Sequence, residues 1–341
     1  MKIGITGVAG FIGSHLLDAF LAKGYEVIGV DNLTMGSLRN IEHHNGNSKF
    51  QFIKVDVRDF ETLREAFQPV DRIVHLAAFK IPRYGNAIET LEVNNLGGKN
   101  VLEVARGGLR RVVLASTSDI YGKNPNVPFS EDSDSVIGPS TVPRWSYAVS
   151  KLFDEHMAFA YQASYGVPVT ILRFFGSYGP RQHLSWWGGP QSVFISAVLR
   201  DEPMEIHGDG LQTRSFTYIS DLVDGIVRAT EFDAEPACIF NLGNTVEITI
   251  KELAHIIKEL CNTPHPLRLK MVPYSTMGKY EDVQRRIPDI SRARQLLGFE
   301  PKVNLLAGLQ ITIDWQRKVM EGTEGLVSDG SPAKSSTIAA G

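Results

Sequence analysis

Residues 1–13 read MKIGITGVAGFIG, and this stretch decides the fold class. A short apolar run leads directly into a turn that carries Gly7, Gly10 and Gly13, and an amphipathic segment follows as far as Gly24. The pattern predicts a strand, a tight turn and a helix. Glycines in such a turn let the backbone approach a pyrophosphate, and the helix N-terminus presents free N–H groups to it. The stretch therefore predicts a dinucleotide site; the alternative is a turn that only joins a strand to a helix.

The next three apolar runs extend this pattern. The first ends in Asp31, whose carboxylate would accept hydrogen bonds from an adenosine ribose and repel a 2′-phosphate, so it favours NAD over NADP. The second ends just before Asp56, which is a candidate for contact with the adenine amine. Ala77 and Ala78 follow the third and are small enough for the backbone to lie against a cofactor.

Composition excludes several classes of partner. The chain has 341 residues, a net charge of −3 and 21% charged residues, so no basic surplus suggests nucleic acid or an anionic membrane. Its two cysteines, Cys238 and Cys261, lack the spacing of a zinc site and fit a reducing cytoplasm, and we expect no metal. The N-terminal apolar run is too short for a signal peptide, and no stretch is long enough to span a bilayer. We therefore expect a soluble cytoplasmic protein.

Strand-like and helical segments alternate through the first half of the chain. Continuous apolar runs that end at Leu76 and Ala115 are typical of strands covered on both faces, and a long helical pattern lies between them. The alternation predicts an α/β fold: a Rossmann-type, doubly wound parallel sheet of about seven strands, with its ligand at the carboxyl ends of the strands, and a smaller mixed C-terminal substrate domain. In the second half, helices are expected to start at Asp221 and Thr249. The predicted NAD-binding domain is 1–180, to which 213–245 returns; the predicted substrate domain is 181–212 and 246–322, and 323–341 is a disordered tail.

Chemistry is expected where the fifth strand ends. Ser116–Asp119 follows that strand, and Tyr147 and Lys151 stand four residues apart at the start of a later helix, so they share one face. A lysine ammonium and an oxidised nicotinamide both favour phenolate, and they would lower the tyrosine pKa from about 10 towards working pH. Tyr147 would then take the proton of a substrate hydroxyl that Thr117 holds, while hydride leaves the same carbon. The alternative is an ordinary amphipathic helix, because this spacing is common by chance.

The glycine turn, Asn94-x-x-Gly97, the Ser-Thr-Ser stretch at 116–118 and Tyr147-x-x-x-Lys151 resemble the extended short-chain dehydrogenase/reductases. That family includes NAD-dependent nucleotide-sugar epimerases, dehydratases and decarboxylases. The resemblance runs from Met1 to about Lys318 and implies NAD as the cofactor, a UDP-sugar as the substrate and a homodimer. It also implies three catalytic residues, Thr117, Tyr147 and Lys151. The residues expected to bind NAD are Gly7, Gly10, Phe11, Ile12, Gly13, Asp31, Asn32, Asp56, Val57, Leu76, Ala77, Ala78, Asn94, Tyr147 and Lys151.

The second half resembles the substrate-binding part of the same family. Arg214 lies in a segment similar to the loop whose arginine meets the nucleotide diphosphate, where it can form two parallel hydrogen bonds. Arg286 lies in a segment similar to a loop of members that handle UDP-glucuronate; the alternative is that it and Arg285 are surface charges. Lys80 and Arg83 would either bind a uronate carboxylate or be solvated loop charges. The residues expected to bind substrate are Lys80, Ser118, Asp119, Gly176, Ser177, Arg181, Arg214 and Arg286.

Oxidation of C4 of a UDP-hexose gives a 4-keto sugar, and three reactions can follow. Ser118 stands where a dehydratase needs a general acid, which argues against dehydration. Related decarboxylases carry glutamate where this chain has Asp119, one methylene shorter. A 4-epimerase needs only reversible hydride transfer and space for the sugar to turn, and Gly176 leaves such space. The sequence thus predicts a 4-epimerase of UDP-glucuronate; the alternatives are a UDP-glucuronate decarboxylase, a UDP-glucose 4-epimerase and an NAD-sensing protein without catalysis, which would not need Tyr147.

Overall fold

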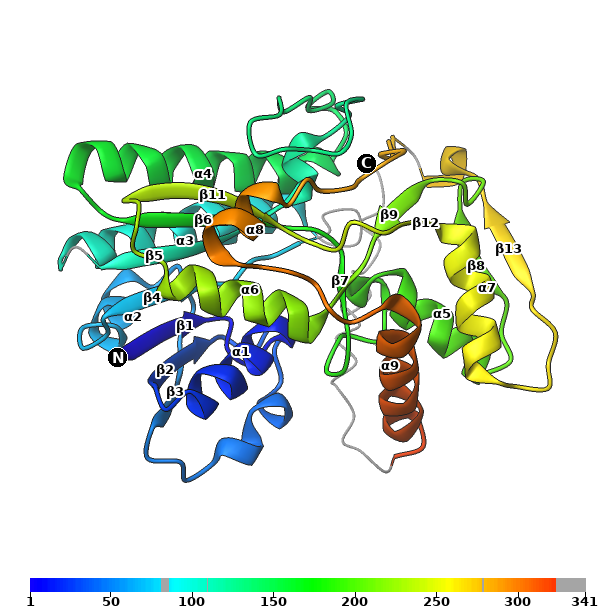
Figure 1. Ribbon diagram of the computed structural model, residues 1–341, viewed down its shortest axis with the longest axis horizontal. Coiled ribbons are helices and arrows are strands. Elements are labelled where there is room, and N and C mark those ends of the chain that lie inside the picture. Colours follow the sequence, from blue (N-terminus) through cyan, green and yellow to red (C-terminus); the bar gives the residue numbers. More distant parts are fainter. Residues whose placement is uncertain (81–85, 109, 278, 323–341) are drawn as a thin grey trace, which may run out of the picture.

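The computed structural model describes residues 1–80, 86–108, 110–277 and 279–322. Its centre is a seven-stranded sheet in which all neighbouring strands are parallel, in the order β11-β6-β5-β4-β1-β2-β3 (Figure 1). These strands are β1 (Lys2–Thr6), β2 (Glu26–Asp31), β3 (Phe50–Lys54), β4 (Arg72–His75), β5 (Arg111–Thr117), β6 (Val169–Phe174) and β11 (Ala237–Leu242). The strand order reverses between β1 and β4, as a doubly wound sheet requires, so the expected fold class and strand number are confirmed.

Helices cover both faces of the sheet (Figure 1). One face carries α1 (Phe11–Ala22) and α6 (Ile219–Glu231), and the other carries α2 (Phe60–Ala66), α3 (Ala87–Arg106) and α4 (Trp145–Tyr165). Strand β1 shows the cause. Ile3 and Ile5 are fully buried in the same cluster as the α1 side chains, whereas Gly4 between them faces the ring of Phe67. Because helices cover both faces of the sheet, side chains on both sides of each strand are buried, and these strands therefore have continuous apolar sequences.

Local sequence sets several helix ends. Asp59 caps α2 by accepting a backbone N–H of its first turn at 3.2 Å, and Thr249 caps α7 (Ile250–Cys261) in a reciprocal capping box, both as expected. The expected helix start at Asp221 is wrong, because α6 begins two residues earlier. The Asp221 carboxylate instead accepts two backbone N–H groups just before the C-terminal helix, so it serves a long-range contact that no local pattern reveals.

Most of the remaining elements gather beyond one end of the sheet (Figure 1). They form three short strand pairs and a group of helices in which α5, α7 and α9 pack against one another. The strand pairs are β7 (Ser177–Tyr178) with β10 (Thr217–Tyr218), β8 (Met204–His207) with β13 (Leu269–Val272), and β9 (Thr213–Ser215) with β12 (Glu247–Thr249); the further helices are α5 (Pro190–Leu199), α8 (Ser291–Leu297) and α9 (Leu305–Met320). No helix in the described ranges is long and apolar enough to cross a membrane. The predicted tail, 323–341, and Arg83 lie outside the described residues.

Candidate active site

Two adjoining cavities open at the carboxyl ends of the parallel strands. The first cavity lies beside the glycine turn after β1, the end of β2 and the segment after β4. The second cavity lies between the end of β5, the start of α4 and the C-terminal segment that carries Arg286. Tyr147, Lys80 and Ser177 line both cavities. Tyr147 therefore stands where ligands in the two cavities would meet.

The glycine turn has no space for side chains, which suits it to a phosphate ligand. Gly7 has a φ of +72°, and a β-carbon there would come within 3.0 Å of the Ala77 nitrogen. A β-carbon on Gly13 would lie 2.1 Å from the Gly7 carbonyl oxygen. The turn thus brings bare backbone and the first N–H groups of α1 to the wall of the first cavity, as a dinucleotide diphosphate requires. The expected NAD-binding residues that line this cavity are Gly7, Gly10, Phe11, Ile12, Gly13, Asp31, Asn32, Val57, Leu76, Ala77, Ala78 and Tyr147.

The Asp31 carboxylate lines the first cavity and also organises the turn. It accepts the N–H of Ala9 at 3.0 Å and that of Leu33 at 2.8 Å. Burial raises the pKa of Asp31, and these two hydrogen bonds act in the opposite direction. Two carboxylate oxygens offer about four acceptor positions, so ribose hydroxyl groups can still be bound. Asn32 lines the cavity as well and donates its amide to Asp56 at 3.0 Å.

The expected NAD-binding residues that do not line the first cavity are Asp56, Asn94 and Lys151. Asn94 is fully buried, and its amide joins two backbone segments. The amide oxygen accepts the N–H of Phe79 at 2.8 Å, and the amide nitrogen donates to Ser150 Oγ at 2.9 Å. Asn94 thus fixes the segment after β4 to the helix that carries Tyr147, and it shapes the cavity from behind its wall.

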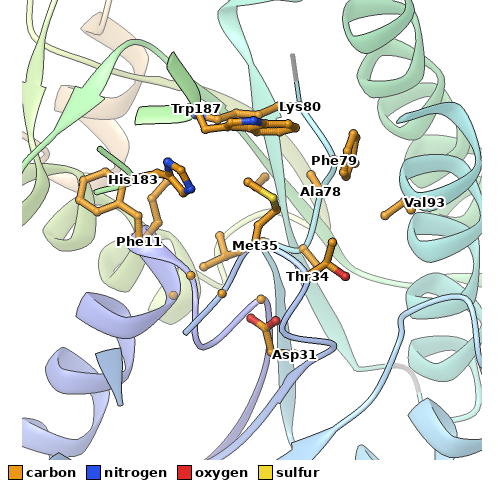
Figure 2. A pocket seen from close by; sticks show the side chains of 18 of the residues that line it. Phe11, Asp31, Thr34, Met35, Ala78, Phe79, Lys80, Val93, His183 and Trp187 are labelled. Carbon is orange, nitrogen blue, oxygen red and sulfur yellow. The ribbon is translucent and has the colours of Figure 1, made fainter. Parts of the chain in front are cut away.

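One wall of the first cavity is aromatic (Figure 2). Phe79 and Trp187 meet edge to face, with 5.1 Å between ring centroids, and His183 faces the same space. These side chains come from segments after β4 and after β7, so the pattern of the glycine turn gives no indication of them. Trp187 and Asp31 both line the first cavity, which therefore runs past both.

Arg181, which we expected at the substrate, lines the first cavity and not the second. Its guanidinium pairs with Asp18 of α1 at 2.8 Å. The other carboxylate oxygen of Asp18 is bound by His43 at 2.8 Å and by His44 at 2.7 Å. Among the described residues Asp18, His43 and His44 form a group that could hold a metal ion. The hydrogen bonds of the two histidines to the Asp18 carboxylate already account for this arrangement.

The Thr117 hydroxyl lies close enough to the Tyr147 hydroxyl to lower the pKa of that tyrosine. Thr117 ends β5, and its Oγ1 also accepts the N–H of Asp119 at 3.2 Å. Tyr147 lies in the first turn of α4. A substrate hydroxyl placed between the two side chains would meet a hydrogen-bond partner and a proton acceptor at one position.

Lys151 is buried one turn further along α4, but its ammonium is bound to Asp154 at 2.9 Å. In the protein alone the pKa of Tyr147 is raised. Burial is the main cause, the carboxylates of Asp119 and Asp154 act in the same direction, and the hydroxyl of Thr117 acts against them. The lowered pKa expected beside both Lys151 and an oxidised nicotinamide stays a prediction.

Three arginines and two aspartates line the second cavity, namely Arg144, Arg214, Arg286, Asp119 and Asp282. Asp119 lies between Arg286 at 2.7 Å and Arg144 at 3.2 Å. Burial raises the pKa of Asp119, but the arginines outweigh burial and hold it below its usual value. The loss of water and the nearby arginines lower the pKa of Arg286 to about 10. Its Nε has no hydrogen-bond partner among the described residues, which suits a cavity for an anionic ligand.

The remaining expected substrate residues are placed as follows. Arg214 lines the second cavity and binds Asp282 at 2.9 Å. Arg285 is exposed and pairs with Glu247 at 2.8 Å, so of the two neighbouring arginines Arg286 is the one at the cavity. Lys80, Ser118, Gly176 and Ser177 also line the second cavity. Lys80 is exposed to solvent; nearby protein lowers the pKa of its ammonium, and Asp119 acts against this effect.

Arg144 is one of the site residues that sequence reasoning missed, together with Asp282 and the aromatic wall of the first cavity. Arg144 precedes α4 directly and lies three residues before Tyr147, with its guanidinium over the Trp145 ring at 4.7 Å from the ring centroid. The available signal was a cation about one helical turn ahead of the expected base, on the same side of the helix.

A doubly wound sheet, a glycine turn after its first strand and a Thr–Tyr pair where two cavities meet define an extended short-chain dehydrogenase/reductase. The comparison with family models agrees, because residues 5–312 match the GDP-mannose 4,6 dehydratase model. The chain belongs to this family of NAD-dependent nucleotide-sugar epimerases, dehydratases and decarboxylases. The family resemblance read from the sequence is thereby confirmed.

Relatives within the family carry two kinds of activity. UDP-N-acetyl-alpha-D-glucosaminuronate decarboxylase from Bacillus cytotoxicus is 36% identical over 92% of this chain and 97% of its own length. UDP-glucuronic acid decarboxylase 1 from Xenopus tropicalis is 39% identical over 94% of this chain and 73% of its own length. The structure of UDP-glucuronic acid 4-epimerase from Bacillus cereus with UDP-glucuronic acid and NAD has a TM-score of 0.83 and 30% identity, and covers 94% of this chain and 100% of its own. The UDP-glucose 4-epimerase from Thermotoga maritima with UDP-glucose has the same values.

Proposed function

We propose that the chain is an NAD-dependent 4-epimerase of UDP-glucuronate that forms UDP-galacturonate through a 4-keto sugar. The charge of the second cavity carries the proposal. Lys80 and three arginines face three carboxylates there, those of Asp119, Asp282 and Glu205. Glu205 is already paired with Lys270 at 2.7 Å, so the cavity keeps an excess of positive charge and suits a ligand with a diphosphate and a further carboxylate. The Bacillus cereus 4-epimerase, whose structure contains UDP-glucuronic acid and NAD, supports this choice of substrate.

The residues of the first cavity fit NAD. The glycine turn would hold the diphosphate, and Asp31 would accept the adenosine ribose hydroxyls. When bound, NAD accepts a hydride from the sugar and returns it. The protein itself supplies the base, the shape of the sugar site and the exclusion of water.

Tyr147 and Thr117 would act on the C4 hydroxyl. Thr117 holds the hydroxyl, and Tyr147 takes its proton during oxidation and gives a proton back after the sugar has turned over. Gly176 lines the cavity in which the sugar must turn. A β-carbon at Gly176 would lie 3.1 Å from the Ser215 carbonyl oxygen, so the site keeps this wall free of a side chain.

Retention of the uronate carboxylate is the feature that separates epimerisation from decarboxylation. Hydrogen bonds and cations at the carboxylate oppose loss of carbon dioxide, because the charge that they stabilise leaves that group in the transition state. Lys80 and Ser118 are available as donors in the second cavity. Asp119 is engaged by Arg286 and Arg144, so its charge is balanced when a substrate carboxylate approaches.

Decarboxylation of UDP-glucuronate is the second candidate. It is favoured by one observation, the 36% and 39% identity to proteins named as uronate decarboxylases, which exceeds the 30% identity to the 4-epimerase structures. A UDP-glucose 4-epimerase would leave the excess positive charge of the second cavity without a carboxylate to bind.

Product analysis by NMR separates these reactions. The purified protein is incubated with UDP-glucuronate and, separately, with UDP-glucose, and no reductant is added. We expect a C4 epimer of the uronate and no net NADH. Mostly pentose with carbon dioxide would replace the proposal with the decarboxylase, and conversion of UDP-glucose alone would replace it with the UDP-glucose epimerase.

Asp119→Glu sharpens the test, because it restores the longer carboxylate of related decarboxylases. We expect the variant to keep measurable epimerisation and to form little pentose. Asp132→Glu is the matched control, since Asp132 is an exposed aspartate that is paired with Arg292 at 2.6 Å and does not line the cavity. Appreciable pentose from Asp119→Glu, but not from the control, would show that one methylene decides the reaction.

A homodimer remains part of the proposal. α3 and α4 pack side by side on one face of the sheet (Figure 1), and their outer sides expose Leu96, Val149 and Phe153. A second copy would cover such an apolar surface. Sedimentation equilibrium of the wild type and of Phe153→Glu tests this: we expect a dimer that the substitution dissociates, and a monomeric wild type would contradict it.

A further inference from the structure

Asp154 is a buried carboxylate beside the expected catalytic lysine, and the mechanism above does not use it. It lies on α4, three residues after Lys151, and its Oδ2 accepts the lysine Nζ at 2.9 Å. Both side chains are at most 2% exposed. The other carboxylate oxygen, Oδ1, has no hydrogen-bond partner among the described residues. Burial raises the pKa of Asp154, and the ammonium of Lys151 acts against it.

The neighbouring helix α3 makes space for this carboxylate. A β-carbon on Gly98 would lie 2.7 Å from Asp154 Oδ1, so a larger residue there would displace the carboxylate. A buried carboxylate oxygen that faces bare backbone without a donor costs stability. The Lys151–Asp154 pair therefore acts through its electrostatic effect on neighbouring ionisable groups.

Ionisable groups from several elements surround the pair and Tyr147. They are Glu155 on α4, His75 on β4, Asp119 on the short 3-10 helix Ser118–Tyr121, and Arg286 on the C-terminal segment. Burial and the charge of Lys151 lower the pKa of His75 to about 3, so His75 is neutral at neutral pH and adds no cation. Lys151 is thus the cation next to Tyr147 on its own helix, and its charge is balanced by Asp154.

We infer that Asp154 is a positioning residue that sets the proton affinity of Tyr147 through Lys151; this rests on the proposed function, in which Tyr147 is the base. With the pair closed, the carboxylate balances the ammonium and Tyr147 stays a phenol. If the carboxylate is removed, the unbalanced ammonium of Lys151, one helical turn from Tyr147, acts on Tyr147 and favours phenolate.

A tyrosinate titration by ultraviolet absorbance measures this in protein without cofactor or substrate. Each variant is compared with its own Tyr147→Phe counterpart, so that the difference reports Tyr147. Asp154→Asn is expected to lower the proton affinity of Tyr147 roughly tenfold or more, which is about one pKa unit. In a Lys151→Met background the same substitution removes only the direct effect of the carboxylate, so the decrease should shrink to about threefold or less. Equal decreases in both backgrounds, or no decrease with Lys151 present, overturn the inference.

Gly98→Ala provides a second variant if Asp154→Asn does not fold. It keeps the carboxylate but forces Oδ1 away from its place, so it should lower the proton affinity of Tyr147 in the same direction. No change in a folded Gly98→Ala protein counts against the inference. In the complete enzyme, the acid limb of the pH profile of kcat/KM should move to lower pH in Asp154→Asn. The titration requires no turnover, so its outcome is separate from that of the product analysis that tests the proposed function.

Discussion

Asp119→Asn tests how far the arginine cluster of the second cavity depends on one carboxylate. The variant keeps the shape of the side chain and removes its charge, so Arg286 loses an ion pair at 2.7 Å and Arg144 loses one at 3.2 Å. Breaking a buried pair by removing one partner costs about 3–5 kcal/mol. The two arginine side chains keep 15% and 13% exposure, and Arg144 retains Asp282 at 3.7 Å, so we take the lower end, about 3 kcal/mol. In a chain of this length that corresponds to a fall in Tm of roughly 4 °C.

Thermal unfolding of the wild type and the variant across pH gives the assay. The pKa of Asp119 is lower in the folded protein than in the unfolded chain, so its contribution is fully present above the unfolded value of about 4 and is lost as pH falls through the folded value. The difference in Tm should therefore be constant from about pH 6 to pH 8 and should close under acid conditions. Asp132→Asn, at a side chain 80% exposed, should change Tm by no more than about 1 °C. An Asp119→Asn protein as stable as this control at neutral pH would refute the reasoning.

Four further substitutions test the two cavities. Tyr147→Phe should fold and bind NAD but lose turnover by about a hundredfold or more, because the C4 hydroxyl proton has no acceptor; turnover within a few-fold of wild type would remove Tyr147 as the base. Gly13→Ala places a methyl group 2.1 Å from a backbone oxygen, so calorimetry should show that NAD binding is lost. Gly10→Ala has its nearest contact at 3.2 Å and should weaken NAD binding less. Equal affinities of the two variants for NAD would contradict the turn geometry. Asp31→Ala should weaken NAD binding and relax discrimination against NADP, and an unchanged preference would show that Asp31 does not contact the ribose.

Features determined by nearby residues were predicted well. Helix α3, Ala87–Arg106, forms where a long helical pattern was expected between two strands, because Asn86 caps its start and glycines follow its end. The parallel sheet follows from apolar runs that each strand carries in its own sequence. Tyr147 and Lys151 lie on one helix as their spacing predicts.

Features that depend on distant residues were not predictable in the same way. The sequence shows the i,i+3 spacing of Lys151 and Asp154. It does not show that their ion pair is buried, because that burial depends on Gly98 of helix α3. Arg181 was expected at the substrate from its place in the chain, yet its guanidinium turns to Asp18 of α1. No local pattern encodes such contacts, because they form only when segments far apart in sequence meet.

The walls of the second cavity come from several segments that are far apart in the sequence. They include 117–119 after β5, 144–147 at the start of α4, 176–177 after β6, Arg214 on β9 and Arg286 before α8. Each part is joined to its neighbours by a different connection, so a substitution in one wall need not disturb the sheet or the glycine turn. The second cavity can therefore be altered one wall at a time while the sheet and the glycine turn keep their structure.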